Sequence, residues 1–275
     1  MPSLSEALQP FAAVIVTGGS SGIGKSFIRL TGTLMARAVI CNLSRRIPPQ
    51  KICPNAEVRL NHFSCDLAQA AEIARAADAV CARIEALAPP GPVLLINNSG
   101  IGAFGSFADS DTARQLEVID VNVRALVDLT GRLLPLLRVR GGAILNVAST
   151  VAFQPTPFAA TYGASKAFVL HWTLALNHEL RGTGVRALAV CPGTTTSEFF
   201  NAAGLAPSAA KKPMTMTADA VAEAALRALA AGRSQVVPGW FNKLYTFAGA
   251  KLPKPLAARV AARALRRYRN DGAGA

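Results

Sequence analysis

Short apolar runs and longer helix-forming stretches alternate from one end of the chain to the other. The β-rich runs cover residues 12–17, 38–43, 57–63, 93–96, 143–148, 185–190 and 235–237. Stretches with the length and composition of helices lie between them, at residues 23–36, 68–87, 111–138 and 161–181. The third of these contains Pro135, where we expect a kink.

Most of the apolar runs are continuous and do not alternate with polar residues. Strands buried on both faces have this pattern, which places helices on both sides of a parallel sheet. Repeated βαβ units predict an α/β fold of three layers, doubly wound and Rossmann-like, with about seven strands. No linker or repeat divides the body, so we interpret residues 1–239 as one domain and residues 240–275 as its helical C-terminal extension.

The composition is that of a globular protein. Of the 275 residues, 51% are hydrophobic and only 16% are charged, which argues against disorder. No apolar run approaches the roughly 20 residues that span a bilayer, and the N-terminus lacks the features of a secretory signal. The five cysteines form no Cys-x-x-Cys pair, so we expect reduced thiols, a cytoplasmic location and no metal site.

The net charge of +13 is concentrated in the tail, where residues 240–275 hold eight Lys or Arg and one acidic residue. No zinc finger, helix-turn-helix or aromatic RNA-binding signature accompanies this charge, so we expect no nucleic-acid partner. A basic amphipathic helix is predicted by an apolar residue at every fourth position: Leu256, Val260, Ala264 and Tyr268. Its apolar side either makes a weak membrane-surface contact or packs over a cleft or a subunit. The small size of these residues favours packing.

A glycine-rich turn follows the first strand and precedes the first helix: Thr17-Gly18-Gly19-Ser20-Ser21-Gly22-Ile23-Gly24. Glycine permits a tight turn and a close approach of the backbone to a pyrophosphate. The free N–H groups at the start of the helix then bind the anion. In a βαβ series this turn predicts a dinucleotide site, although a flexible turn also collects Gly and Ser.

Three further motifs occur in order along the chain: Asn97-Asn98-Ser99-Gly100, Tyr162-Gly-Ala-Ser-Lys166 and Pro192-Gly193. With the glycine-rich turn, they make the sequence resemble the short-chain dehydrogenase/reductase family from about residue 11 to residue 239. Ser99 replaces the alanine of the family motif. The resemblance implies a hydride transfer between NAD(P)H and a carbonyl or alcohol, and a homodimer or homotetramer.

The resemblance also implies a catalytic group of Asn122, Ser149, Tyr162 and Lys166. Tyr162 would be the general acid/base, and Ser149 would orient the carbonyl. Tyr162 and Lys166 are four positions apart, so a helix places them on one face. A nearby ammonium favours a phenolate, so we expect Lys166 to lower the pKa of Tyr162. Asn122 would organise a proton-relay water.

The second strand ends in Ser44-Arg45-Arg46, where NAD-selective proteins of this topology carry an acidic residue. Guanidinium groups suit a phosphate, so these residues predict NADP(H). The other cofactor contacts that the resemblance implies are Thr17, Gly18, Ser20, Ser21, Gly22, Ile23, Gly24, Asp66, Leu67, Asn98, Ser99, Gly100, Tyr162, Lys166, Pro192, Gly193, Thr194 and Thr195.

Four phenylalanines fit either an apolar substrate pocket or the core: Phe153, Phe158, Phe199 and Phe200. A pocket would favour an apolar ketone or aldehyde. A serine hydrolase is disfavoured, because Ser149 does not lie in a Gly-x-Ser-x-Gly turn. The alternative from another class is a non-catalytic nucleotide-binding regulatory protein with the same fold.

Overall fold

The computed structural model describes residues 3–35, 37–49, 52–53, 58–199, 203 and 215–265. A central sheet has the strand order β3-β2-β1-β4-β5-β6-β9, and every pairing in it is parallel. Its strands are β1 (Ala13–Thr17), β2 (Val39–Leu43), β3 (Arg59–Phe63), β4 (Val93–Asn97), β5 (Gly142–Val147), β6 (Val185–Val190) and β9 (Gln235–Val236).

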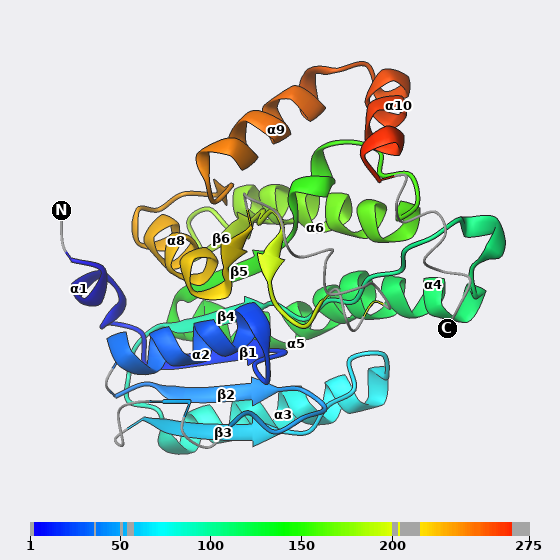
Figure 1. The fold of residues 1–275 in the computed structure, drawn as a ribbon. Helices are drawn as coiled ribbons and strands as arrows, with labels where there is room; N and C mark the ends of the chain where they lie inside the picture. The colour runs from blue at the N-terminus through cyan, green and yellow to red at the C-terminus, as the bar shows by residue number, and fades with distance from the viewer. Residues whose placement is uncertain are drawn as a thin grey trace.

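Helices cover both faces of this sheet (Figure 1). One layer contains α1 (Leu4–Leu8), α2 (Gly22–Leu34) and α8 (Ala218–Ala230), and the other contains α3 (Ala70–Leu87), α5 (Ala125–Arg140) and α6 (Ala160–Glu179). Leu145 packs in the apolar cluster of α2 and α8, whereas its neighbour Ile144 packs in that of α3 and α5. Consecutive strand residues therefore fill two cores, which explains the continuous apolar runs. The predicted doubly wound fold is confirmed.

The sheet reverses its winding at β1 and β4, which are neighbours although β2 and β3 separate them in the chain. In such sheets a crevice opens beyond the carboxyl ends of the two central strands. The glycine-rich turn after β1 and the Asn97–Gly100 motif after β4 are therefore brought to one edge.

The helical region predicted at residues 111–138 departs from α geometry at a different place than expected. It consists of α4 (Thr112–Ile119), a π-helical segment at Asp120–Arg124 and α5, which runs through Pro135. The π segment contains Asn122, whose buried side chain bonds to the backbone of Ile101. A π turn adds a residue to the helix and so re-aims one side chain, here toward the site.

Other elements differ from the sequence prediction in smaller ways. Edge strand β3 is partly exposed and carries polar side chains. A two-stranded sheet of β7 (Thr195–Thr196) and β8 (Met216–Thr217), together with α1 and α8, was not predicted. Short helical turns lie at η1 (Phe107–Asp109) and η3 (Thr150–Phe153). None of the helices in the described ranges combines the length and the hydrophobicity needed to cross a bilayer.

The C-terminal extension contains two helices, α9 (Trp240–Lys251) and α10 (Lys254–Leu265), where the sequence predicted one. The predicted inward face of α10 is wrong. Leu256 and Val260 are exposed, whereas Ala257 and Ala261 are buried, because the small residues allow closer packing. The position predicted at Tyr268 lies outside the described residues.

The start of β5 gives a test of this packing. A Cβ on Gly142 would lie 2.2 Å from the carbonyl oxygen of Val93 in β4. We expect Gly142→Ala to lower the free energy of unfolding by about 1–3 kcal/mol, because backbone must move to make room. Gly131→Ala in α5 is the control: its Cβ meets nothing within 4 Å, and it should gain about 1 kcal/mol in helix propensity. Urea unfolding measures both; equal shifts would contradict the prediction.

Candidate active site

The glycine-rich turn forms a narrow backbone cradle before α2. Gly18 and Gly22 have φ of +69° and +52°, the left-handed region that favours glycine. A Cβ on Gly24 would lie 2.2 Å from the carbonyl oxygen of Gly18. The first turn of α2 therefore comes closer to the turn after β1 than it could with any residue other than glycine at position 24. The α2 N-terminus therefore presents its N–H groups toward the crevice, as an anion site requires.

Hydrogen bonds tie this cradle to the end of β4. The Thr17 hydroxyl accepts from the backbone N–H of both Asn98 and Ser99, each at 3.0 Å. The Asn98 amide donates in return to the carbonyl of Thr17 at 2.9 Å. The Ser99 hydroxyl lies against Gly18, where a Cβ would come within 2.7 Å of it. The two strand ends are thus fixed with respect to each other.

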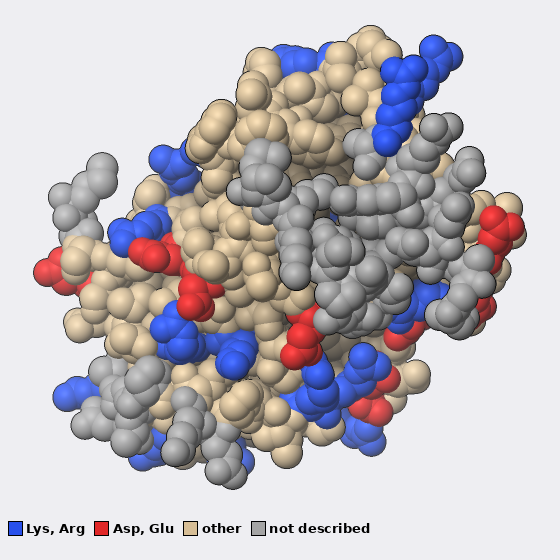
Figure 2. All heavy atoms as spheres, viewed as in Figure 1, with Lys and Arg blue, Asp and Glu red and all other residues tan. Residues whose placement is uncertain are grey.

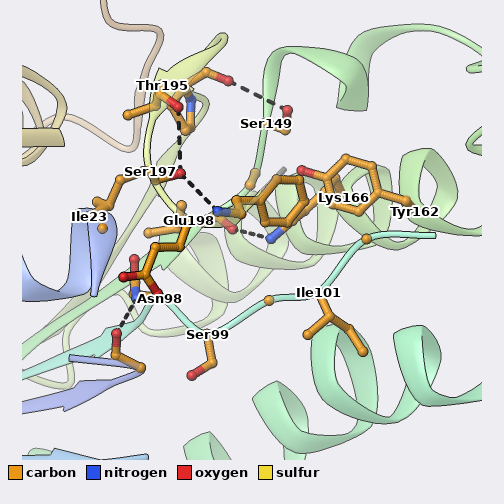
Figure 3. Close-up of a pocket in the computed structure, with 18 of the residues that line it drawn as sticks. Ile23, Asn98, Ser99, Ile101, Ser149, Tyr162, Lys166, Thr195, Ser197 and Glu198 are labelled. Atoms are coloured by element: carbon orange, nitrogen blue, oxygen red, sulfur yellow. Dashed lines mark hydrogen bonds between the residues drawn. The ribbon is translucent and has the colours of Figure 1, made fainter. Parts of the chain in front are cut away.

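Three predicted catalytic side chains face the same hollow (Figure 3). Ser149 follows β5 and caps η3, where its hydroxyl accepts from the N–H of Val151 at 3.3 Å. Tyr162 and Lys166 lie one turn apart on α6, and both line the cavity beside Ser149, whose hydroxyl donates to the Pro192 carbonyl at 3.5 Å. The Lys166 Nζ donates to the carbonyl of Val147 at 2.8 Å and lies 6.0 Å from the centroid of the Tyr162 ring.

Burial sets the protonation of this pair. It raises the pKa of Tyr162 to about 12, although the nearby Ser149 hydroxyl opposes this shift. It also lowers the pKa of Lys166 to about 8, against the opposing effect of Cys191. The expected lowering of the Tyr162 pKa is therefore wrong for the protein alone, because desolvation dominates and the ammonium is directed to a carbonyl. The phenol of Tyr162 is therefore protonated at neutral pH.

Asn122 stands behind the wall of the site. Its side chain accepts from the N–H of Ile101 at 2.9 Å, donates to the Ile101 carbonyl at 3.0 Å and donates to the Ser165 hydroxyl at 2.9 Å. It therefore clamps the segment after Gly100 to α6. The side chain lies near Lys166, since a Cβ on Gly100 would touch both the Lys166 Nζ and the Asn122 Oδ1, at 3.0 and 3.3 Å.

The end of β2 carries two exposed guanidinium groups. The Arg46 side chain donates to the Ser21 hydroxyl at 3.2 Å and to the Glu198 carboxylate at 3.0 Å, which joins this turn to the cradle and to the segment after β7. Arg45 lines the same cavity. The Ser44 hydroxyl is buried and donates to the Arg46 carbonyl at 2.7 Å. It therefore shapes the turn and also lines the cavity.

One cavity of about 1240 Å³ joins these parts. A small-molecule site usually takes about 300–1,000 Å³, so a cofactor and a substrate fit together. Most predicted site residues line it: Gly18, Ser20, Ser21, Gly22, Ile23, Ser44, Arg45, Arg46, Asp66, Leu67, Asn98, Ser99, Gly100, Ser149, Tyr162, Lys166, Pro192, Gly193, Thr194 and Thr195. Thr17, Gly24 and Asn122 lie behind this surface and support it.

The aromatic part of the cavity was only partly predicted. Phe199 lies 5.4 Å from Tyr162 and Phe104 lies 5.7 Å from it, measured between ring centroids. Phe153 packs in the core cluster of α6, Phe158 does not line the cavity, and Phe200 lies outside the described residues. Sequence reasoning missed Phe104, Ser197, Glu198, Phe241, Asn242 and Tyr245. The last three come from α9, whose aromatic composition was visible in the sequence. For the C-terminal extension the sequence left open a membrane-surface contact or packing over a cleft or a subunit, and α9 lies over the cleft.

Comparisons with known proteins agree with this geometry. The family model described as short chain dehydrogenase matches residues 12–207. A short chain dehydrogenase of Pseudocercospora fijiensis is 33% identical over 73% of this chain, and the match covers 65% of that relative, slightly under two thirds of its length. The ketoacyl reductase HetN of Nostoc is 31% identical over 82% of this chain and 77% of its own.

A solved structure has the same architecture. A short-chain dehydrogenase from Sphingobium yanoikuyae, in complex with NADPH, superposes with a TM-score of 0.73. It is 27% identical and covers 88% of this chain and 94% of its own.

Proposed function

The chain belongs to the short-chain dehydrogenase/reductase family, and from that premise we propose an NADP(H)-dependent oxidoreductase that interconverts an apolar ketone or aldehyde and its alcohol. The observation that carries the proposal is the grouping of Ser149, Tyr162 and Lys166 in a cavity continuous with the glycine cradle, with the Lys166 Nζ 6.0 Å from the centroid of the Tyr162 ring. A protein that only binds nucleotide has no need of this arrangement.

The residues assign the steps of a reduction. The nicotinamide dinucleotide supplies the hydride when it is bound. Tyr162 donates its proton to the carbonyl oxygen, and the Ser149 hydroxyl donates a hydrogen bond to the same atom. The Lys166 ammonium beside the ring stabilises the phenolate that is left, and Lys166 would also hold the ribose of the nicotinamide. The raised pKa of Tyr162 keeps the proton available at neutral pH, which favours reduction.

The cavity fits the dinucleotide. The cradle at Gly18 and Gly24 admits a pyrophosphate where any side chain would clash. At the end of β2, Arg45 and Arg46 offer two positive charges, of which Glu198 neutralises one. An acidic residue that would repel a 2′-phosphate is absent from the β2 turn at residues 44–46. The NADPH complex of the Sphingobium relative supports the same choice.

The surroundings of Tyr162 favour an apolar substrate. Its ring is in a cluster with Ala103, Val118 and Ala159, against which Phe104 and Phe199 pack. The cationic side chain of Arg114 also reaches the cavity, but its guanidinium is paired with Glu117 at 2.5 Å and donates to the Gly102 carbonyl at 3.1 Å. A carbonyl flanked by apolar groups therefore fits better than an anion.

Tyr162→Phe tests the general acid. NADPH consumption over a panel of aldehydes, ketones and quinones should show a kcat/KM about 10²–10⁴-fold lower, with NADPH binding retained. Tyr245→Phe is the matched control, since Tyr245 lines the cavity but bonds to Gln154, and it should stay within a few-fold of the wild type. If the wild type bound NADPH but reduced none of the carbonyls, the alternative of a non-catalytic nucleotide-binding protein would be favoured.

The pH dependence should differ between the two directions. With a Tyr162 pKa of about 12, the phenol stays protonated across the neutral range, so reduction should lose nothing to its ionisation there. Alcohol oxidation needs the phenolate, so its rate should rise with pH, up to about tenfold per unit, until Lys166 loses its charge near pH 8. Initial rates in both directions over a buffer series measure this. An oxidation rate that is flat from neutral to alkaline pH would contradict the assignment.

Arg45→Ala with Arg46→Ala tests the choice of cofactor. Each lost charge-assisted contact to a 2′-phosphate costs about 1.5–3 kcal/mol, so the KM for NADPH should rise at least about tenfold while that for NADH changes little. Arg59→Ala on edge strand β3 controls for the lost charge alone. Wild-type protein that uses NADH as well as NADPH would contradict the role of the two arginines.

A further inference from the structure

Helix α9 packs against the body through small and polar residues, whereas an ordinary surface helix packs through its apolar side. Its buried positions are Thr246 and Gly249, with Asn242 half-buried beside them. A Cβ on Gly249 would lie 2.0 Å from the Gln154 Oε1 in the loop after η3, so this face is in close contact with the body. Small and polar residues therefore face inward, where surface helices normally place their apolar side.

The outward face of α9 is large and apolar. Trp240, Leu244 and Phe247 recur at positions i, i+4 and i+7, which is one face of a helix, and they are 77%, 57% and 63% exposed. Helix α10 continues the pattern, since Leu256 and Val260 are 45% and 50% exposed while Ala257 and Ala261 are buried. We name these five exposed apolar residues the outer face.

Basic side chains share helices α9 and α10 with the outer face. Lys243, Lys251, Arg259 and Arg263 are all exposed, and residues 240–265 contain no acidic residue. Figure 1 shows that α9 and α10 stand together above the α6 side of the sheet. In Figure 2 the surface over these two helices displays blue Lys and Arg side chains beside the tan surface of α9, and no red Asp or Glu.

We propose that the outer face docks on an anionic lipid surface. Tryptophan and phenylalanine with flanking Lys and Arg are the composition of interfacial helices, whose apolar side enters the headgroup region while the cations meet anionic lipids. A second copy of this chain is a poorer occupant, because a two-fold contact of this face would bring the two basic sets together.

The proposal gives α9 two separate roles, one in lining the cavity and one in docking. Phe241, Asn242 and Tyr245 of α9 line the cavity, whereas Trp240, Leu244 and Phe247 do not. Docking would therefore bring the cavity wall next to the lipid, and the docking residues can be changed without entering the site.

Vesicle co-sedimentation of the full chain tests the proposal, with phosphatidylcholine alone and with an equal mixture of phosphatidylcholine and phosphatidylglycerol. Wild-type protein should sediment with the anionic vesicles. The triple variant Trp240→Ser/Leu244→Ser/Phe247→Ser should lower the partition coefficient at least about a hundredfold. Lys243→Gln/Lys251→Gln/Arg259→Gln should lower it roughly fivefold per charge on anionic vesicles only.

The control variant Val139→Ser/Phe107→Ser removes large apolar groups that are 86% and 64% exposed on α5 and η1, and it should bind as the wild type does. Circular dichroism and activity on a water-soluble carbonyl check that each variant folds, and neither measures docking. Failure of wild-type protein to bind either vesicle, or binding that survives the triple variant, would overturn the proposal. So would light scattering that shows a wild-type oligomer lost in the triple variant, since a second copy would then cover the face.

Discussion

The close approach of β1 and β4 at their carboxyl ends is the constraint from which the site follows. The two strands are adjacent, but the chain leaves them in opposite directions, so a crevice opens between their following loops. Glycines at 18 and 24 let the loop after β1 turn within backbone contact, and the Thr17 hydroxyl holds two N–H groups of the loop after β4. Hydrogen bonds therefore fix the two sides of the crevice to each other, and the candidate catalytic residues after β5 and on α6 line the same cavity.

The doubly wound arrangement and about half of the cavity lining could be predicted, because the apolar runs and the motifs are local signals. Continuous apolar runs report burial on both faces, and the glycine-rich turn and the Tyr162–Lys166 spacing each lie within one element. The position of α9 and the inward face of α10 could not be predicted. Each depends on which side of the helix packs against the body, and the sequence of the helix alone does not determine that. In α10 the closer packing of Ala257 and Ala261 prevailed over the larger Leu256 and Val260.

The chemistry of the site also depended on features that no motif displays. The spacing of Tyr162 and Lys166 is the same whether the pair is solvated or buried, yet burial reverses the direction of the phenol's pKa. The role of Asn122 likewise depends on the π turn, which aims its amide at Ile101 and Ser165. Ser44, which was expected at a phosphate, lines the cavity and donates to the Arg46 carbonyl. In each case the residue could be singled out from the sequence, whereas its hydrogen-bond partners and its burial could not.

The way in which α9 is attached bears on how the protein can change over generations. The helix that supplies Phe241 and Tyr245 to the cavity rests on the body through Thr246 and Gly249, and it contributes none of the large side chains that fill the two cores of the sheet. Substitutions at the cavity positions of α9 therefore change one part of the cavity wall while leaving the packing of the sheet intact. That part of the wall can vary without cost to the fold, whereas Phe104 and Phe199 line the cavity from a packed cluster of the body.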